Sequence, residues 1–226
     1  MLSPLSRAAL LAALVSVSGG CLASDRGSFL VLGGSHAPQE DLVECVHAAG
    51  VEVDDARGDF AEVFRLYQRL TAPQAAELED LSETFEDALE TCQDRAKHLT
   101  KRLDAVQREN DELVQDWQAE LQQFSGETMR KKSESMLQET HGRSKRVLDA
   151  LTRVQDRMQP VVLKLQDYAL FFHHNLNARA IATLQDTYKD FDAEFRALES
   201  EFGKARQEVD AFLEAFTVPV PAEPAR

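Results

Sequence analysis

The sequence predicts an all-α fold: an elongated, antiparallel four-helix coiled-coil bundle with long helices. Apolar residues recur every seven positions along most of the chain, the spacing of helices packed lengthwise. Breaks near residues 71–73, 125–126 and 171–181 divide this pattern into four registers. At the last break, the register that follows is displaced by two residues from the register that precedes it, roughly half a helical turn. A reversal of the chain there explains the displacement better than a straight helix.

Length and charge restrict the classes of function. The chain has 226 residues, 43% hydrophobic and 28% charged, which suits one folded domain. Its 39 acidic and 25 basic residues give a net charge of −14, or −15 once a signal segment containing Arg7 is removed. Such a chain should repel phosphate backbones, so we expect no nucleic-acid partner. Two basic clusters, at residues 130–132 and 143–146, are the places where a local contact with nucleic acid is still compatible with the sequence.

The N-terminus is typical of an exported protein. Arg7 precedes an apolar run, residues 8–17, that is too short to span a bilayer, so we expect residues 1–20 to be a signal peptide. The stretch Val17-Ser18-Gly19-Gly20-Cys21 resembles the lipobox of bacterial lipoproteins, except that Ser18 replaces an aliphatic residue. This resemblance implies lipidation at Cys21 and, since Leu22 is not Asp, an outer-membrane lipoprotein facing the periplasm. An ordinary signal peptide with a chance Cys is the alternative.

The helical domain is expected over residues 38–216. Residues 21–37 are Gly- and Ser-rich and should form the lipidated N-terminus and a flexible tether. Pro38 suits the opening turn of a first helix that runs to about Leu70. Gly50 and Gly58 should each weaken that helix by about 1 kcal/mol relative to Ala.

The second helix is expected from Pro73 to about Phe124, with apolar rows unbroken for more than five heptads. Asn110 falls on the buried seam, where a single Asn can fix the register of paired helices. Between Glu77 and Asp94 there are eight acids and no base, which we interpret as a solvated face rather than a cation site.

Two cysteines remain if Cys21 takes the lipid. A chain reversal near Ala72 places Cys45 opposite a residue about eight positions beyond Cys92, an offset of roughly 12 Å at helical rise. We therefore predict packed or free thiols rather than a disulfide.

The third helix should follow Ser125-Gly126, with Ser125 or Thr128 as its N-cap, and continue through Pro160 to about His174, because the register keeps its phase across that proline. The fourth should run from Asn177 to about Phe216. Residues 217–226 contain repeated prolines and are expected to be a disordered tail.

The turn between the third and fourth helices holds the candidate site. Asn175 and Asn177 fall on seam rows at helix ends, so we assign them to capping. His173, His174 and Arg179 fall on polar rows and should face water, as a candidate partner-binding apex. The alternative is an ordinary solvated helix end. Adjacent histidines point about 100° apart on a helix, so we predict no metal site.

No catalytic motif is present. The sequence lacks a P-loop, a Gly-x-Ser-x-Gly elbow and a His-Glu-x-x-His pair. We therefore predict a protein that is not an enzyme and has no cofactor and no small-molecule substrate.

The block Met158-Gln159-Pro160-Val161-Val162, with residues 170–182 after it, resembles a bacterial family of coiled-coil lipoproteins known only as a domain of unknown function, the 2959 type. The resemblance extends over roughly residues 40–216 and implies an exported, long-helical, lipid-anchored protein. It supplies no catalytic residues. The expected role is an envelope scaffold or interaction module, bound to the membrane through its lipid and to a protein partner, or to itself, through its helices. A membrane-surface-binding protein that uses amphipathic helices is the alternative.

Overall fold

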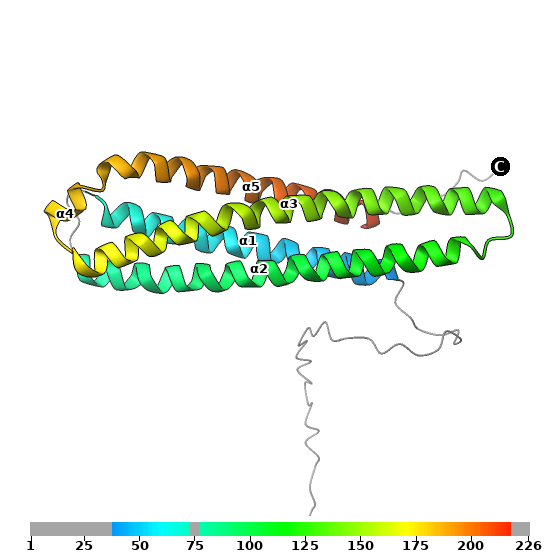
Figure 1. Ribbon diagram of the computed structural model, residues 1–226, viewed down its shortest axis with the longest axis horizontal. Helices are drawn as coiled ribbons and strands as arrows, with labels where there is room; N and C mark the ends of the chain where they lie inside the picture. The colour runs from blue at the N-terminus through cyan, green and yellow to red at the C-terminus, as the bar shows by residue number, and fades with distance from the viewer. Residues whose placement is uncertain (1–37, 73–76, 218–226) are drawn as a thin grey trace, which may run out of the picture. The chain divides into compact units, whose positions relative to one another are not determined.

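Four long helices pack against one another in antiparallel order (Figure 1). They are α1 (Pro38–Leu70), α2 (Leu78–Leu121), α3 (Glu127–His174) and α5 (Gln185–Thr217), and the short helix α4 (Ala178–Ala182) lies between α3 and α5. The computed structural model describes residues 38–72 and 77–217. The four long helices form a closed ring of neighbours, α1 with α2, α2 with α3, α3 with α5 and α5 with α1. The predicted all-α, antiparallel four-helix architecture is confirmed.

The core is built from the heptad rows, and its largest fully buried side chains are aromatic. Phe60 of α1 packs against Phe202 of α5 with ring centroids 5.9 Å apart. Phe64 and Phe195 stack at 4.0 Å, and Tyr67 meets Phe191 edge-on at 5.0 Å. Rings of this size bury more apolar area than aliphatic side chains, so the α1–α5 contact contributes strongly to the stability of the fold.

Gly50 lies where α1 and α5 approach each other closely. A Cβ atom at Gly50 would come within 2.7 Å of Cγ1 of Val209 and 3.1 Å of Nη1 of Arg206. The expectation that Gly50 only weakens α1 is therefore incomplete, because the missing side chain is what lets α5 pack there. At Gly58 the same atom would meet nothing within 4 Å.

The two cysteines of the described region are buried thiols, as predicted. Cys45 lies on α1 and Cys92 on α2, and neither takes part in a disulfide within the described residues. Burial, followed by the nearby carboxylate of Asp59, raises the pKa of the Cys92 thiol to about 12. The reactive thiolate form of Cys92 is therefore almost absent at neutral pH.

Two helices begin differently from expectation. Among the described residues, α2 begins at Leu78, while Pro73 lies outside that region. At the start of α3 the N-cap residue is Gly126, with no side-chain hydrogen bond, so neither Ser125 nor Thr128 caps the helix. As predicted, α3 continues through Pro160.

The predicted fourth helix is interrupted at Thr183 and Leu184, which separate α4 from α5. The backbone amides of Thr183 and Leu184 donate to residues three positions back, and the Thr183 hydroxyl donates to the Ala180 carbonyl at 2.6 Å. The carbonyl of Ala180 thus accepts from both the amide and the hydroxyl of Thr183, and the Leu184 amide bonds to Ile181 rather than to the carbonyl four positions back, so the regular α-helical bonding ends here.

The helices α2 and α3, which form a hairpin, are each longer than α1 and α5. These two helices have 44 and 48 residues, against 33 each for α1 and α5. In Figure 1 the hairpin extends past the start of α1 and the end of α5. We call this two-helix projection, residues 111–138, the arm, and the rest the four-helix section. None of the helices in the described region offers an apolar stretch long enough to cross a bilayer.

Several expectations concern residues outside the described region. They are the signal peptide over 1–20, lipidation at Cys21, the tether up to residue 37, and the tail after residue 217.

Candidate functional site

The apex, residues 173–184, closes the α3–α5 end of the bundle by hydrogen bonds from its two asparagines. The Asn175 side chain donates through Nδ2 to the Phe171 carbonyl at 3.1 Å, at the end of α3. The Asn177 side chain accepts from the Ala180 amide at 2.9 Å and is the N-cap of α4. Each side chain satisfies a backbone group that a helix end leaves without a partner, so both belong to the construction of the turn.

The three side chains proposed for partner contact are all exposed: His173, His174 and Arg179. The two imidazole rings lie edge to face with centroids 4.9 Å apart. Nδ1 of His173 lies 3.9 Å from Oε1 of Glu86 on α2. The structure thus brings His173 to the acidic face of α2, while Arg179 lies on α4.

The acidic run on α2 is a solvated face. All eight acids between Glu77 and Asp94 are exposed. Within the described ranges no three His, Cys, Asp or Glu side chains gather closely enough to hold a metal ion.

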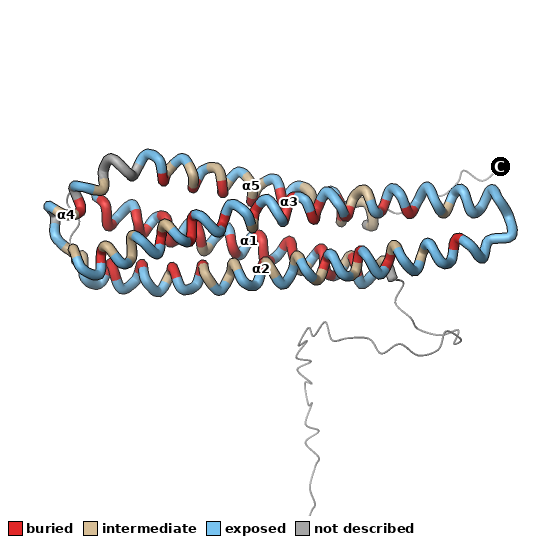
Figure 2. Tube along the Cα trace, viewed as in Figure 1, coloured by how far each residue is buried: buried red, intermediate tan, exposed pale blue. Residues whose placement is uncertain are grey.

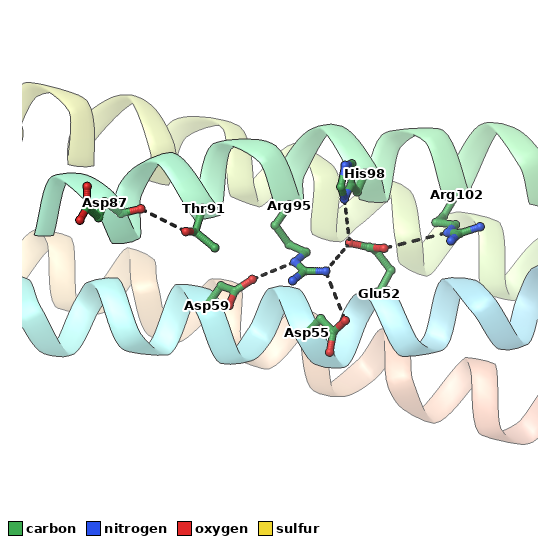
Figure 3. A network of polar contacts seen from close by, with 8 residues as sticks. All are labelled: Glu52, Asp55, Asp59, Asp87, Thr91, Arg95, His98 and Arg102. Carbon is green, nitrogen blue, oxygen red and sulfur yellow. Dashed lines mark hydrogen bonds and ion pairs between the residues drawn. The ribbon is translucent and has the colours of Figure 1, made fainter. Parts of the chain in front are cut away.

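A network of charges ties α1 to α2 in the four-helix section, and sequence analysis missed it (Figure 3). Arg95 donates to Glu52 at 3.0 Å, to Asp55 at 3.2 Å and to Asp59 at 2.8 Å. Burial by itself would lower the pKa of Arg95, but the hydrogen bonds that Arg95 donates to Glu52 and Asp59 raise its pKa above the ordinary value. One guanidinium therefore holds three carboxylates of α1 in one register.

The signal for this network was present in the spacing. The acids Glu52, Asp55 and Asp59 lie at i, i+3 and i+7 on α1, and Arg95, His98 and Arg102 repeat the same spacing on α2. Residues at these spacings share one face of a helix. In Figure 3 His98 and Arg102 also lie beside Glu52, at 3.8 and 4.0 Å.

The arm is held by a narrow seam with several polar members. Asn110, only 2% exposed, accepts from the Ser144 hydroxyl at 2.5 Å where the arm leaves the four-helix section. Further out, Nε1 of Trp117 donates to Oγ of Ser133 at 2.8 Å. Asn110 thus lies on the buried seam, as its heptad position predicts, and its hydrogen bond with Ser144 joins α2 to α3.

Large apolar side chains are exposed on the arm. Met129 and Met136 are each 58% exposed, and Phe124 at the tip is 40% exposed. They lie beside the exposed basic run 130–132 on the same hairpin, and Figure 2 shows the arm mainly in the colour of exposed residues. Exposed methionines in a row are typical of adaptable binding surfaces.

The family model described as "Protein of unknown function (DUF2959)" matches residues 34–216. The chain belongs to this family. A search of curated proteins and a search of solved structures each gave no significant match.

The DUF2959 match includes both ends of the bundle. It covers the apex, the Arg95 network and the arm, and it stops within the last turn of α5. Cys21 precedes the matched segment. Membership of the DUF2959 family therefore relates to the helical unit, and the role of the N-terminal segment has to be argued separately.

Proposed function

We propose that this DUF2959 protein is a non-enzymatic scaffold, or protein-interaction module, anchored in the cell envelope by a lipid. In this proposal residues 1–20 are removed as a signal peptide, Cys21 carries the lipid, and the protein is an outer-membrane lipoprotein that faces the periplasm. The apolar run after Arg7 and the small residues before Cys21 support the anchor. The seven-residue apolar rows support coiled-coil packing of the helices.

The observation that carries the interaction role is the arm. On the arm, α2 and α3 continue without α1 and α5 (Figure 1), and Met129 and Met136 of α3 are exposed there. Two exposed methionines seven residues apart share one face of α3, and flexible methionine side chains suit an adaptable contact. The apex, with His173, His174 and Arg179, is a second candidate contact at the other end of α3.

The anchor is tested by Cys21→Ser. Without its thiol the protein cannot be lipidated, so we expect the variant to leave the detergent phase and to appear as a soluble or uncleaved species. Detergent partitioning of the full chain, compared with the wild type, measures this. Unchanged partitioning would contradict the anchor.

The interaction role is tested by photo-crosslinking in cells from positions 136 on the arm and 174 at the apex. Position 97, which is exposed near the middle of α2, is the matched control. We expect discrete crosslinked species from at least one of the two ends and none from the control. If all three positions give the same background, the scaffold proposal fails.

The apex is tested separately by changing His173, His174 and Arg179 together to Ala. Because all three are exposed, helicity and melting temperature should stay nearly unchanged. Any crosslinked partner captured from the apex should be lost. A variant that folds and keeps that partner would place the contact elsewhere, and one that unfolds would make the residues structural.

A membrane-surface-binding protein that uses amphipathic helices is the second candidate. The observation that favours it is the tip of the arm, where Phe124 and Met129 are exposed next to three consecutive bases. Co-sedimentation of the Cys21→Ser chain with anionic vesicles separates the two candidates. Binding that depends on the bases 130–132 would favour the membrane surface over a protein partner.

A further inference from the structure

We infer that the arm swings as one body about a joint at its base. The joint consists of residues 140–144 of α3 and of Asn110 on α2, which is hydrogen-bonded to Ser144. It lies where the projecting part of the hairpin leaves the four-helix section (Figure 1). This motion is an addition to the proposed function and does not rest on it.

The first argument is the composition of the joint on α3. Four of its five residues there are weak helix formers: Thr140, His141, Gly142 and Ser144. Gly142 is the only glycine of α3, and a Cβ atom added to it would meet nothing within 4 Å, so packing does not require its small size. Sharp bends in helices occur preferentially where Gly and Ser lie close together in this way.

The second argument is that side chains bond to backbone carbonyls of the joint. The Ser144 hydroxyl lies 3.0 Å from the His141 carbonyl oxygen, and Nη1 of Arg146 donates to the Gly142 carbonyl at 3.3 Å. A side chain that bonds to a carbonyl of its own helix competes with the backbone hydrogen bonds and often bends the helix. When α3 bends here, these two carbonyls therefore keep a hydrogen-bond partner.

The third argument is the polar seam between the two helices at this level. Three of its buried positions are polar, Asn110, Thr140 and Ser144, with exposed fractions of 2%, 7% and 0%. One heptad further along the same rows of α3, Val147 and Leu151 are apolar and buried. A polar seam buries less apolar area and so resists bending less. The hydrogen bond from Ser144 to Asn110 meanwhile keeps α2 and α3 in register, so that both helices turn together.

The fourth argument is the position of the joint relative to the neighbouring helices. Arg146, two residues after residue 144, pairs with Glu208 of α5 at 3.4 Å, which holds α3 on the section side of the joint. Since α3 and α5 are antiparallel, residues 140–144 lie level with about the last two turns of α5, which ends at Thr217. Further out, α2 and α3 continue without α1 and α5 (Figure 1). One side of the joint is thus held by the bundle, and the other side is not.

Pro160 is a second weak point of α3 and provides a contrast. The helix continues through this proline, which lacks a backbone donor. On both sides of it, however, α3 is tied to α5, by Arg153 with Glu201 and by Lys164 with Glu194. A bend at Pro160 would have to carry α5 with it, so the swing is confined to the joint.

The swing moves the arm over a measurable distance. Lys131 lies 11 residues before Gly142, roughly 17 Å at helical rise, so a bend of about 20° displaces Lys131 by roughly 6 Å. Hinge motions of this kind are slow compared with side-chain motion, and distances measured in frozen solution sample their whole range.

The swing is tested by distances between pairs of spin labels, attached to introduced cysteines in the full-length protein. A label at Lys131 on the arm is paired with one at His47 on α1 or at Ala211 on α5, all of which are exposed. The control replaces position 131 by Asp156, which is exposed on the same face of α3 and about equally far from Ala211 along the helix axis, but on the section side of the joint. We expect at least one of the distributions from position 131 to be about twice as broad as its control. Equal widths for both partners would overturn the inference.

A pair of labels within the arm separates swinging from unfolding. Asp116 on α2 and Ser135 on α3 are both exposed, and labels there should give a distribution as narrow as the control, because the two helices move together. A distribution as broad as that from position 131 would show that the arm comes apart, which contradicts motion as one body. Wild-type protein treated with the label reports any background from Cys45 and Cys92, which are buried.

Gly142→Ala tests the joint itself. The added methyl group meets no neighbour and raises helix propensity, so the variant should fold and should narrow the broad distribution from position 131 toward its control. Gly203→Ala is the matched variant, because a methyl group at Gly203 on α5 also meets nothing within 4 Å and lies outside the joint. It should leave the width unchanged. If Gly142→Ala does not narrow the distribution, or if Gly203→Ala narrows it equally, residues 140–144 are not the pivot and the inference fails.

Discussion

The four-helix section and the arm are built from the same two helices but are stabilised differently. In the four-helix section α2 and α3 share a core with α1 and α5, which supply most of the buried aromatic rings. On the arm the same helices have only each other (Figure 1). A heptad pattern therefore specifies which face of a helix is apolar, and the number of neighbouring helices decides how much of that face is buried.

The residues of the seam change accordingly along α2. Within the four-helix section one row of the seam holds Leu89, Ala96 and Leu103, which are apolar and belong to the core or pack against it. At the base of the arm and beyond it, Asn110 and Trp117 take seam positions and form hydrogen bonds to α3. A two-helix seam has too few neighbours to bury a broad apolar face, so directional polar contacts make up a larger share of its stability.

The largest difference between the two regions should appear when a large apolar side chain is truncated. Phe202 is fully buried against Phe60, and Phe202→Ala should cost about 3 to 5 kcal/mol of unfolding free energy through lost burial and a cavity. Met136→Ala on the arm should cost less than about 0.5 kcal/mol in monomeric protein, because that side chain is already exposed. Urea denaturation at low protein concentration measures both. Equal costs would show that the arm is packed like the four-helix section.

The next difference concerns charge in the four-helix section. The side chain of Arg95 is 24% exposed and that of Glu52 only 10% exposed, so Arg95→Ala leaves a mostly buried carboxylate without its main cation. We expect a loss of about 2 to 3 kcal/mol, somewhat less than for a fully buried pair. Arg102→Ala is the control, because Arg102 lies on the same row, is more exposed and is 4.0 Å from Glu52. Its cost should be below about 1 kcal/mol.

The two glycines of α1 should respond in opposite directions to Ala. Gly50→Ala should destabilise by about 1 to 3 kcal/mol, because the new methyl group would overlap Val209 in the packed core. Gly58→Ala should stabilise by about 0.5 to 1 kcal/mol through helix propensity, since it meets no neighbour. Thermal melts of the two variants provide the comparison. Stabilisation by both would mean that α1 and α5 can separate at Gly50 without cost.

The smallest effect is expected from a partly buried ion pair. Glu201 accepts from Lys204 at 2.8 Å and from Arg153 at 3.3 Å, and the hydrogen bond from Lys204, ahead of the one from Arg153, lowers the pKa of its carboxyl. A lowered pKa in the folded state means that the contact stabilises above the ordinary glutamate pKa and is lost as pH falls through the folded-state value. Glu201→Gln should therefore cost under about 1 kcal/mol at neutral pH and almost nothing in acid.

The arm again provides the control for this titration. Glu127 and Lys131 lie 2.7 Å apart and are both largely exposed. Glu127→Gln should give no measurable change at either pH. Urea midpoints at neutral pH and near pH 3 distinguish the two variants, and a pH-independent cost at Glu201 would contradict the stated cause.

Much of the fold was predictable because heptad rows are local information. The four long helices and the reversal near Asn175 follow from apolar spacing alone. The Arg95 network was missed because charges were compared within helices rather than between them. Gly50 could not be assigned to a close approach, since that depends on where Val209 of another helix lies. The break at Thr183 and Leu184 leaves the apolar row intact, so it cannot be read from apolar spacing.

The site was less predictable than the fold. Capping positions at Asn175 and Asn177 can be read from helix ends, and exposure of His173 from its polar row. The arm arises from a difference in length between helices that are far apart in sequence. The predicted helix ranges already differed in length. That this difference leaves α2 and α3 projecting as an arm follows only from the arrangement in space, in which α1 and α5 end before the hairpin does (Figure 1).

The burial of Cys45 and Cys92 bears on how long the native protein survives in an oxidising compartment. In the envelope that we propose for this protein, a thiol that becomes accessible is captured as a mixed disulfide. Each opening of the bundle that exposes these thiols then carries a risk of irreversible trapping, whatever the equilibrium between open and closed forms. The lifetime of the native protein is therefore set by its unfolding rate. The ring pair of Phe60 and Phe202 is fully buried and joins α1 to α5, so it should protect the thiols more than surface ion pairs do.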